Sequence, residues 1–486
     1  MLVKQITVQM ALRAAAFAFA LAAVLIVPHA IRNDEYGRFV LALTACQLGA
    51  TVLLSWPNQG TLRYGREEFA HHARLGETFA ARLAIHAAIL VAALGGALAL
   101  GHSVAGMFEL PGGAFTWLLM LALIVLPLSD LGAVATQIVG RFFVYGLSQV
   151  LVRFAQFAAL AGIAAGLLPG EWIVLVLAAI MGWAAAAAIS WTGTAGTIAR
   201  GFRWRSDVAG RLFAYGRFMV FGSLAAYLVA SMDLWFIKAW RGMPEVGVYG
   251  WAYAISLLAT SLLVPIGGLL APRAIDARLS ADKIRLATIA RVLLAVTALT
   301  MAVMPVAVSL LGGLAQTVEL GGYRGAVAPA LVILAGTAFQ LSVSLMEPVI
   351  FAHERLVARA VGLMFVIAAT NALVDFLLIP IVGILGAAIG TAAAFAVGTL
   401  IQWNIARREF SLAGWLPSYS LVAFGAVPVM AALAWPMLPM FLSIALSCVL
   451  SLALGLIARQ SGWFRGFTDL NAAITELPLR LRRRIG

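Results

Sequence analysis

The chain has 486 residues, of which 63% are hydrophobic and 11% are charged, and its formal net charge is +13. Apolar runs repeatedly reach the ~20 residues that cross a bilayer, which excludes a soluble globular protein. These runs are continuous rather than alternating with polar residues, which excludes a transmembrane barrel. The sequence therefore predicts an all-α polytopic membrane protein.

The apolar runs predict about fourteen transmembrane helices. The N-terminal run is long and lacks a small-x-small cleavage site, so we interpret it as a retained first helix rather than a signal peptide. In chain order, the predicted spans are 10–31, 37–57, 79–100, 115–140, 148–168, 171–194, 212–237, 246–270, 288–311, 326–351, 359–380, 383–405, 413–435 and 439–458.

Lysine and arginine are distributed unequally between the two predicted faces of the membrane. One face holds 28 of them, including the group at 63–82, and the other holds Arg32, Arg38, Lys238, Arg241 and Arg324. The positive-inside rule makes the basic face cytoplasmic, with both termini there; the resemblance described below implies a bacterial inner membrane. The net charge therefore predicts contact with anionic membrane lipids and no nucleic-acid partner.

Two segments open in the same way after the first and the seventh predicted spans. Tyr36-Gly37 and Tyr249-Gly250 each begin a helix, which favours two pseudo-repeated six-helix lobes, as in many transporters. The basic tail either binds acidic headgroups or only follows the orientation rule. We predict an N-lobe at 1–205, a C-lobe at 206–411, two appended helices at 412–460 and a basic cytoplasmic tail at 461–486.

The stretch "DFLLIPIVGILGAAIGTAAA" predicts a helical hairpin between the eleventh and twelfth spans. We expect Pro380 to end the first helix and Gly383 to form the tight return. Gly386 and Gly390 then make a GxxxG step, which lets two helix backbones approach closely in lipid. We interpret the hairpin as a packing element without chemistry of its own.

Three stretches resemble oligosaccharide flippases of the multidrug/oligosaccharidyl-lipid/polysaccharide exporter superfamily. "NALVDFLLIPIVGILGAAIGTAAA" (371–394) is similar to their Asn…Leu-Ile-Pro…Gly-Ile-x-Gly-Ala-Ala pattern. The others are "NDEYGRFVLALTACQLGATVLLSWPNQGTLRYGREE" and "SMDLWFIKAWRGMPEVGVYGWAYAI". The family often has Ala where this chain has Gly390, and we expect little consequence from that difference.

No motif for bond-making chemistry is visible in the sequence. P-loop, HExxH and GxSxG patterns are absent, and two cysteines and six histidines show no disulfide framework or metal-ligand spacing. The predicted outer loops are short, whereas a glycan polymerase needs a sizeable one. We therefore predict no enzyme activity, no catalytic residue, no metal and no cofactor.

Four acidic residues lie within predicted spans, where charges are costly. Asp130 and Glu347 are either gating or proton-linked groups, or buried partners that lock helices together. Asp233 and Asp375 lie nearer the outer ends of their spans. They either contribute to an outer gate or an ion-coupling site, or only cap a helix or pair locally.

Three arginines on the cytoplasmic half are candidates for substrate binding: Arg13, Arg153 and Arg217. A diphosphate needs fixed positive charge, and Arg can offer two parallel donors to its oxygens. The alternative is that each side chain extends to the headgroups and only orients the protein.

The resemblance implies a flippase for polyprenyl-diphosphate-linked oligosaccharides in exopolysaccharide, capsule or O-antigen assembly. It also implies alternating access, and partners among polysaccharide-assembly proteins. A gradient of H+ or Na+, or consumption of the product outside, could drive transport. A multidrug or small-molecule antiporter of the same superfamily is the alternative, and a membrane glycan polymerase or acyltransferase is the second alternative.

Overall fold

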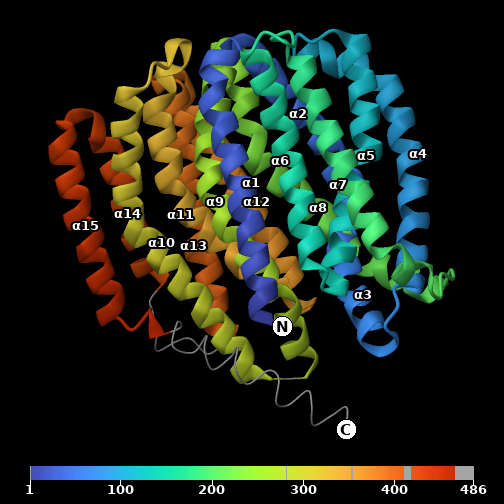
Figure 1. Cartoon of the computed structure of the whole chain (residues 1–486). Coiled ribbons are helices and arrows are strands. Elements are labelled where there is room, and N and C mark those ends of the chain that lie inside the picture. The colour runs from blue at the N-terminus through green and yellow to red at the C-terminus, as the bar shows by residue number, and fades with distance from the viewer. Residues whose placement is uncertain (1, 281, 352–353, 410–417, 466–486) are drawn as a thin grey trace. The chain divides into compact units, whose positions relative to one another are not determined.

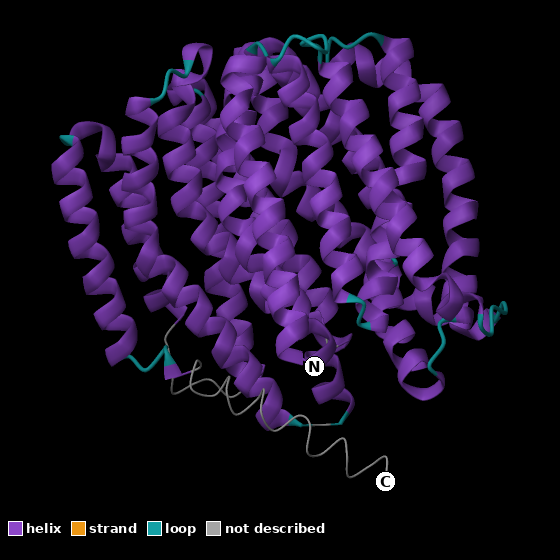
Figure 2. Cartoon of the chain, viewed as in Figure 1, coloured by secondary structure: helices purple, strands orange, loops and turns teal. Residues whose placement is uncertain are grey.

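The computed structural model describes residues 2–280, 282–351, 354–409 and 418–465. Helices dominate, and no strand occurs among these residues (Figure 2). Thirteen of the helices are long and apolar enough to cross a membrane. The predicted class, an all-α polytopic membrane protein, is therefore confirmed. The chain is helical because backbone groups in lipid must form hydrogen bonds within their own segment.

The thirteen candidate spans match thirteen of the fourteen predicted ones. The remaining predicted span, 246–270, lies on the 37-residue helix α9, Met243–Leu279. The predicted tail beyond residue 465 and the beginning of the predicted span 413–435 lie outside the described residues.

The helices group into two compact units. Unit 1 contains Met1–Ala254 and Leu320–Arg324. Its helices are labelled in Figure 1. They are α1 (Leu2–Ala30), α2 (Asn33–Leu48), the π-helical segment η1 (Gly49–Ser55), α3 (Asn58–His72), α4 (Gly76–Met107), α5 (Gly112–Val139), α6 (Phe142–Ala164), α7 (Trp172–Ala199), α8 (Ser206–Arg241) and the first part of α9.

Unit 1 is held together by neighbouring helices that pack along their length. The main pairs are α1 with α6, α6 with α7, α5 with α7, and α4 with α5. The helix α8 packs against η1, α3 and α4. The core between α3, α4 and α5 is apolar, with Leu75, Phe79 and Leu131 completely buried.

The helical hydrogen-bond pattern is interrupted between α2 and α3. The α2 helix widens into η1, which ends before Trp56-Pro57, and α3 then begins at Asn58. Proline has no N–H, so the hydrogen-bond ladder cannot continue unchanged through residue 57. Thr61 secures the new helix, since its Oγ1 donates to the Pro57 carbonyl at 3.0 Å. This break places α3 between two candidate spans.

The first turns of α2 and α9 approach each other closely in unit 1. A Cβ on Gly247 would lie 1.8 Å from the carbonyl oxygen of Asn33, and one on Gly37 would lie 2.5 Å from that of Met243. Only glycines allow the two backbones to pack at this distance. The prediction that α2 and α9 are pseudo-repeated elements of two lobes stays a prediction, because the division into units does not test internal symmetry.

Unit 2 contains Ile255–Glu319 and the chain from Gly325 onward. In it α12 packs on α13, α11 on α13 and α14, and α10 on α11, α14 and α15. A Cβ on Gly312 of α10 would overlap the ring of Trp435, so the last helices fit closely against the rest of the unit. Its helices are the remainder of α9, α10 (Lys283–Thr317), α11 (Val327–Phe351), α12 (Glu354–Val382), α13 (Ile384–Glu409), α14 (Ser418–Ala434) and α15 (Met440–Gln460), with the short 3-10 segment η3 (Trp435–Met437). The 3-10 segment η2 (Gly321–Ala326) begins in unit 1 and ends in unit 2.

Candidate functional site

A cluster of polar side chains lies inside unit 1, where α4 and α5 meet the break between η1 and α3. Charged groups are rare at such positions and usually mark a functional path or a structural lock. The members of this buried polar cluster are Ser55, Asn58, Arg82, His86 and Asp130.

Arg82 occupies the centre of the cluster, and its side chain is 0% exposed. Its Nη2 donates to the carbonyl oxygen of Leu54 at 2.6 Å and to Oδ1 of Asn58 at 3.2 Å. A cation beside the last carbonyls of a helical segment is favourable, so Arg82 stabilises the end of η1. The charge distribution in the sequence counts Arg82 with the basic face, its nearest face, and this stays a prediction. Helix α4 begins at Gly76, so Arg82 lies well inside the bundle.

Asp130 approaches the same break from α5. Its Oδ2 accepts a hydrogen bond from the hydroxyl of Ser55 at 3.0 Å. The charges of Asp130 and Arg82 attract each other, yet among the described residues no ion pair joins them. A carboxylate held by one hydroxyl, with a buried cation near it, can exchange partners when the helices move.

His86 lies one turn after Arg82 on the same face of α4, and it is 4% exposed. Neither ring nitrogen has a hydrogen-bond partner within the described part of the chain. Buried polar groups are nearly always paired, so this ring is a candidate for contact with a proton or a ligand. Neither Arg82 nor His86 was identified from the sequence as part of a site. The i, i+4 spacing of Arg82 and His86 inside an apolar helix was the available signal.

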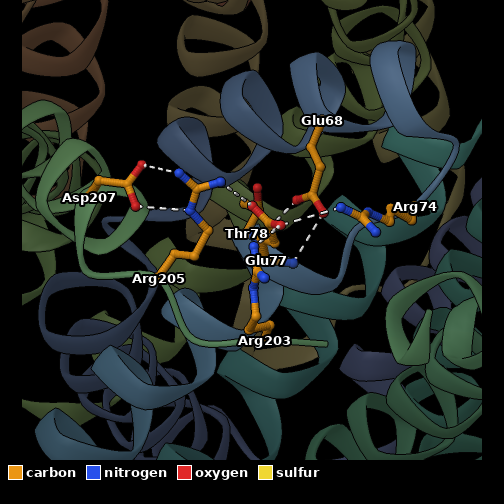
Figure 3. Close-up of polar contacts among 7 residues, drawn as sticks. All are labelled: Glu68, Arg74, Glu77, Thr78, Arg203, Arg205 and Asp207. Carbon is orange, nitrogen blue, oxygen red and sulfur yellow. Dashed lines mark hydrogen bonds and ion pairs between the residues drawn. The ribbon is translucent and has the colours of Figure 1, made fainter. Parts of the chain in front are cut away.

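A second polar cluster lies at the start of α4, on the predicted cytoplasmic side (Figure 3). The carboxylate of Glu77 is almost buried, and it forms ion pairs with three arginines. The N–O distances are 3.3 Å to Arg74, 3.3 Å to Arg203 and 3.2 Å to Arg205. The pKa of Arg205 is raised mainly by its hydrogen bonds to Asp207 and, to a smaller extent, by its attraction to Glu77. Glu77 therefore connects α4 to the segment between α7 and α8.

Glu68 of α3 completes this corner. Its two carboxylate oxygens accept hydrogen bonds from the backbone N–H groups of Glu77 at 3.0 Å and Thr78 at 2.8 Å. A carboxylate at the first N–H groups of a helix satisfies donors that have no partner in the helix. Beside it, a Cβ on Gly76 would lie 2.2 Å from the Gly201 carbonyl carbon, so α4 packs directly on the linker.

Asp233, a predicted gating residue, lies on α8 and is 2% exposed. It accepts a hydrogen bond from the hydroxyl of Tyr249 on α9. Lys238, five residues later, binds Glu109 of the α4–α5 connection instead. The hydrogen bond from Lys238 holds the pKa of the exposed Glu109 carboxyl below its ordinary value.

Asp375 lies within unit 2 on α12 and is completely buried. The Nδ2 of Asn371, one turn earlier, donates to its Oδ2 at 3.3 Å. A Cβ on Gly390 would lie 2.3 Å from Oδ1 of Asp375. The missing methyl group of Gly390 makes room for this carboxylate, a local consequence that the sequence pattern did not indicate. Glu347, on α11, is half-buried, and no hydrogen bond or ion pair joins it to another described residue.

The three candidate arginines lie on different helices of unit 1. Arg13 of α1 is half-buried, with its guanidinium carbon 5.2 Å from the ring centre of Tyr145 on the adjacent α6. Arg153 of α6 and Arg217 of α8 are exposed. Their roles in substrate binding stay predictions.

The predicted hairpin is present between α12 and α13. The first helix continues through Pro380 to Val382, two residues beyond the predicted end, because a proline in the last turn need not interrupt a helix. Gly383 then turns the chain with φ 66°. A Cβ on Gly386 would lie 2.6 Å from the Leu378 carbonyl carbon, which is the close backbone approach expected for this step.

No group of three or more His, Cys, Asp and Glu side chains within the described ranges is arranged to hold a metal ion. The clusters above are built instead from cations, single carboxylates and hydroxyls. Such groups can bind anions, exchange ion-pair partners or carry protons.

Comparisons with known proteins give a clear result for the fold. Neither a protein-family model nor a curated protein sequence matches this chain. Among solved structures, the lipid II flippase MurJ in an inward closed conformation matches with a TM-score of 0.65 and 9% identity, over 94% of this chain and 99% of that chain. A multidrug resistance MATE transporter of the MOP superfamily in an outward-facing conformation gives a TM-score of 0.57 and 14% identity, over 84% and 95%.

A third match is a mutant form of the Vibrio cholerae MATE transporter VcmN. It has a TM-score of 0.56 and 12% identity, over 83% of this chain and 99% of that chain. The resemblance seen in the sequence is thus confirmed at the level of architecture. The chain is a polytopic membrane protein with the fold that the MurJ flippase and the MATE transporters of the MOP superfamily share.

Proposed function

We propose that this protein flips polyprenyl-diphosphate-linked oligosaccharides across the bacterial inner membrane for exopolysaccharide, capsule or O-antigen assembly. It would act by alternating access, without making or breaking covalent bonds in its substrate. The sugar-diphosphate headgroup would cross through the protein while the polyprenyl tail stays in the lipid.

The observation that carries this proposal is the extent of the match to the lipid II flippase. That match covers 94% of this chain, more than residues 1–411 alone could supply, so it extends into the last two helices. The two MATE matches cover 84% and 83% of this chain, a length that residues 1–411, with the first twelve predicted spans, could supply by themselves. The extra helix pair favours a transporter of lipid-linked substrates.

Fixed positive charge would hold the diphosphate. Arg13 and Arg153 lie on the adjacent helices α1 and α6, and Arg217 lies on α8. Each guanidinium offers parallel N–H donors that fit phosphate oxygens, and Arg13 is already oriented by the ring of Tyr145.

Ion coupling would use the buried acids. In unit 1, the charge of Asp130 on α5 is attracted to that of Arg82 on α4, so a proton that neutralises Asp130 would change the attraction between the two helices. Asp233, Asp375 and Glu347 are the other candidates for H+ or Na+ coupling. Consumption of the product outside would supply direction if no ion does.

The test is a reconstituted assay with fluorescently labelled lipid-linked oligosaccharide in liposomes. We expect protein-dependent movement of the label to the opposite leaflet, measured by its protection from a membrane-impermeant quencher. Gradients of H+ and of Na+, imposed separately, identify the coupling ion. No movement of the lipid, together with efflux of cationic dyes, would overturn the proposal in favour of the antiporter.

The substrate role of Arg217 is tested in the same assay. We expect Arg217→Ala to slow flipping by about tenfold, the scale of one lost charge-assisted contact, and Arg217→Lys to slow it less. Equal rates in both variants would remove Arg217 from the substrate site.

The antiporter is the second candidate, and the two MATE matches favour it. Its substrates are expected to be cations bound by acids such as Asp130 and Glu347. We do not propose the glycan polymerase, because α4 and α5 are joined by residues 108–111 alone, too short a connection for a catalytic loop.

A further inference from the structure

We propose that the buried polar cluster of unit 1 binds a small monovalent anion of the size of chloride. The ligand would lie against N–H groups of Arg82 and the ring of His86, which are on neighbouring turns of α4. The site is distinct from the candidate substrate arginines Arg13, Arg153 and Arg217, which lie on α1, α6 and α8. This inference does not depend on which substrate is transported.

Arg82 uses only one of its three side-chain nitrogen atoms for hydrogen bonds. Its Nη2 donates to the Leu54 carbonyl at 2.6 Å and to Oδ1 of Asn58 at 3.2 Å. Its Nε and Nη1 are buried, and neither has a hydrogen-bond partner among the described residues. Guanidinium nitrogens only donate, so the group that completes them must be an acceptor. A buried donor without a partner is costly, which indicates a bound species at this position.

His86 adds a second unsatisfied group on the same face of α4. It follows Arg82 by about 6 Å along the helix axis, and the charge of Arg82 acts on its ring. The side chain is 4% exposed, and neither ring nitrogen has a partner in the described part of the chain. A neutral imidazole can direct its one N–H from either nitrogen. The unused donors of the two residues can therefore meet at one acceptor.

Two apolar layers enclose the polar cluster along α4 and α5. One layer contains Phe79 of α4 and Leu131 of α5, and the other contains Ala93 of α4 and Leu126 of α5. The polar cluster lies between these layers in both helices. In such surroundings a cation that is not neutralised costs most, and a bound anion is attracted most strongly.

The charge of Arg82 favours an anion over a water molecule. Both of its hydrogen bonds go to neutral groups, a carbonyl and an amide oxygen. It forms no ion pair with any described residue, although the charge of Asp130 acts on it. Water would accept the hydrogen bonds but brings no charge, whereas an anion accepts them and also neutralises the guanidinium. Because Arg82 is 0% exposed, the ligand must consist of very few atoms.

Asp130 would compete with the anion for Arg82. Its Oδ2 accepts a hydrogen bond from Ser55 at 3.0 Å instead of contacting the guanidinium. In an arrangement with Asp130 in direct contact with Arg82, the carboxylate would take the place of the anion. The anion therefore favours the arrangement described here, in which Arg82 holds the Leu54 carbonyl at the end of η1. Chloride would bias the conformational equilibrium of unit 1 in this way.

The test is thermal unfolding of the full chain, purified in neutral detergent without lipid-linked substrate. The buffers contain sodium chloride, sodium bromide or sodium gluconate at equal concentration and pH, so only the anion changes. We expect a melting temperature about 2 °C higher in chloride and bromide than in the larger gluconate, and a further rise with chloride concentration. Equal melting temperatures of the unmodified chain in all three salts would overturn the proposal and leave water as the occupant.

His86→Phe locates the effect. It replaces an unpartnered buried ring by an apolar ring, a change that the fold should tolerate. We expect this variant to lose the difference between chloride and gluconate. His102→Phe, the same change at an exposed position of α4, is the matched control and should keep the difference. A full chloride response in His86→Phe would mean that the anion binds elsewhere, and the proposal would fail.

Two further variants test the charges. Asp130→Asn removes the competing carboxylate, so half of the stabilisation should be reached at an about tenfold lower chloride concentration. Arg82→Gln should abolish the response, and the results for His86→Phe and Asp130→Asn decide the question even if Arg82→Gln does not fold. An unchanged or weaker response to chloride in Asp130→Asn would overturn the site, because its carboxylate would then not compete for Arg82.

Discussion

Gly390 shows how the absence of a side chain can be a structural requirement. Its position on α13 faces Asp375 on α12, and a methyl group there would lie 2.3 Å from a carboxylate oxygen. A buried carboxylate keeps its hydrogen bonds only if its surroundings hold it in place. The glycine therefore preserves the pairing of Asp375 with Asn371.

We expect Gly390→Ala to destabilise the protein by about 1–3 kcal/mol, because the packed carboxylate must move. The measurement is the melting temperature of the purified protein in detergent. Gly362→Ala, on α12, is the matched control, since a Cβ there meets nothing within 4 Å. That control should be neutral or stabilising by up to about 1 kcal/mol. An equal response of both variants would contradict the role given to Gly390.

Asp130 combines a single hydroxyl partner with a buried cation nearby. Asn at this position keeps the size and a hydrogen-bond acceptor and removes the charge. We expect Asp130→Asn to flatten the pH dependence of transport, measured as the initial rate in liposomes from acidic to alkaline pH. Ser55→Ala keeps the titratable carboxylate, so the rate should still vary with pH, with a displaced midpoint because the hydrogen bond to Asp130 is lost. A pH profile that stays unchanged in Asp130→Asn would leave this residue as a structural partner only.

For individual residues, the acids within the predicted spans could be identified from the sequence, but the residues that pair with them could not. Asp130 and Asp375 could be found because charges interrupt apolar runs. Arg82 was counted with the basic face of the membrane, because hydropathy does not reveal that its guanidinium binds Leu54 and Asn58 at the break before α3. His86 was missed for the same reason.

Among the elements, α4 and the 200–205 linker are joined by a single carboxylate. Glu77 receives three arginines from two segments of the chain, and its side chain is 12% exposed. A carboxylate shared by several cations contributes more than an isolated surface pair. Its removal should therefore release the linker.

We expect Glu77→Gln to cost about 2 kcal/mol, the scale of hydrogen bonds to a charged group. The linker contains Arg200, Arg203 and Arg205, so trypsin should cleave it several-fold faster in this variant. Asp207→Asn is the control, because its pair with Arg205 is exposed and should contribute less than about 0.5 kcal/mol. Identical cleavage rates in all three proteins would show that Glu77 does not hold the linker.

The crossing of α2 and α9 is the second feature at this scale. Gly247 contacts the backbone of Asn33, and a methyl group there cannot fit without separating the two helices. We expect Gly247→Ala to speed backbone hydrogen exchange in Asn33–Gly37 and Met243–Gly247 by about tenfold, through more frequent local opening. The exchange rate of each segment is measured by mass spectrometry of the peptides obtained by proteolysis.

Gly113→Ala is the control for this crossing, because a Cβ at Gly113 meets nothing within 4 Å. Exchange in both segments should match the unmodified chain. Unaltered exchange in Gly247→Ala would mean that the helices accommodate the methyl group and that the contact does not restrain them.

For the whole molecule, hydropathy and charge were enough to predict the class and the order of the helices. The cost of placing an unpaired backbone group or a charge in lipid is large, so the membrane limits the possible structures strongly. The pairing of helices was not predictable, because van der Waals packing of Gly, Ala and Leu leaves little trace in composition. The hairpin of α12 and α13 was the exception, since its glycines recur at helical spacing.

The π-helical segment η1 has a consequence for movement. Seven residues, Gly49–Ser55, are wound more loosely than in an α-helix, so the segment stores chain length in a folded form. Rewinding it into ordinary turns would lengthen α2 along its axis without breaking most of its ladder. Interconversion between π-helical and α-helical turns would let α2 change its length while the contacts at its two ends are kept.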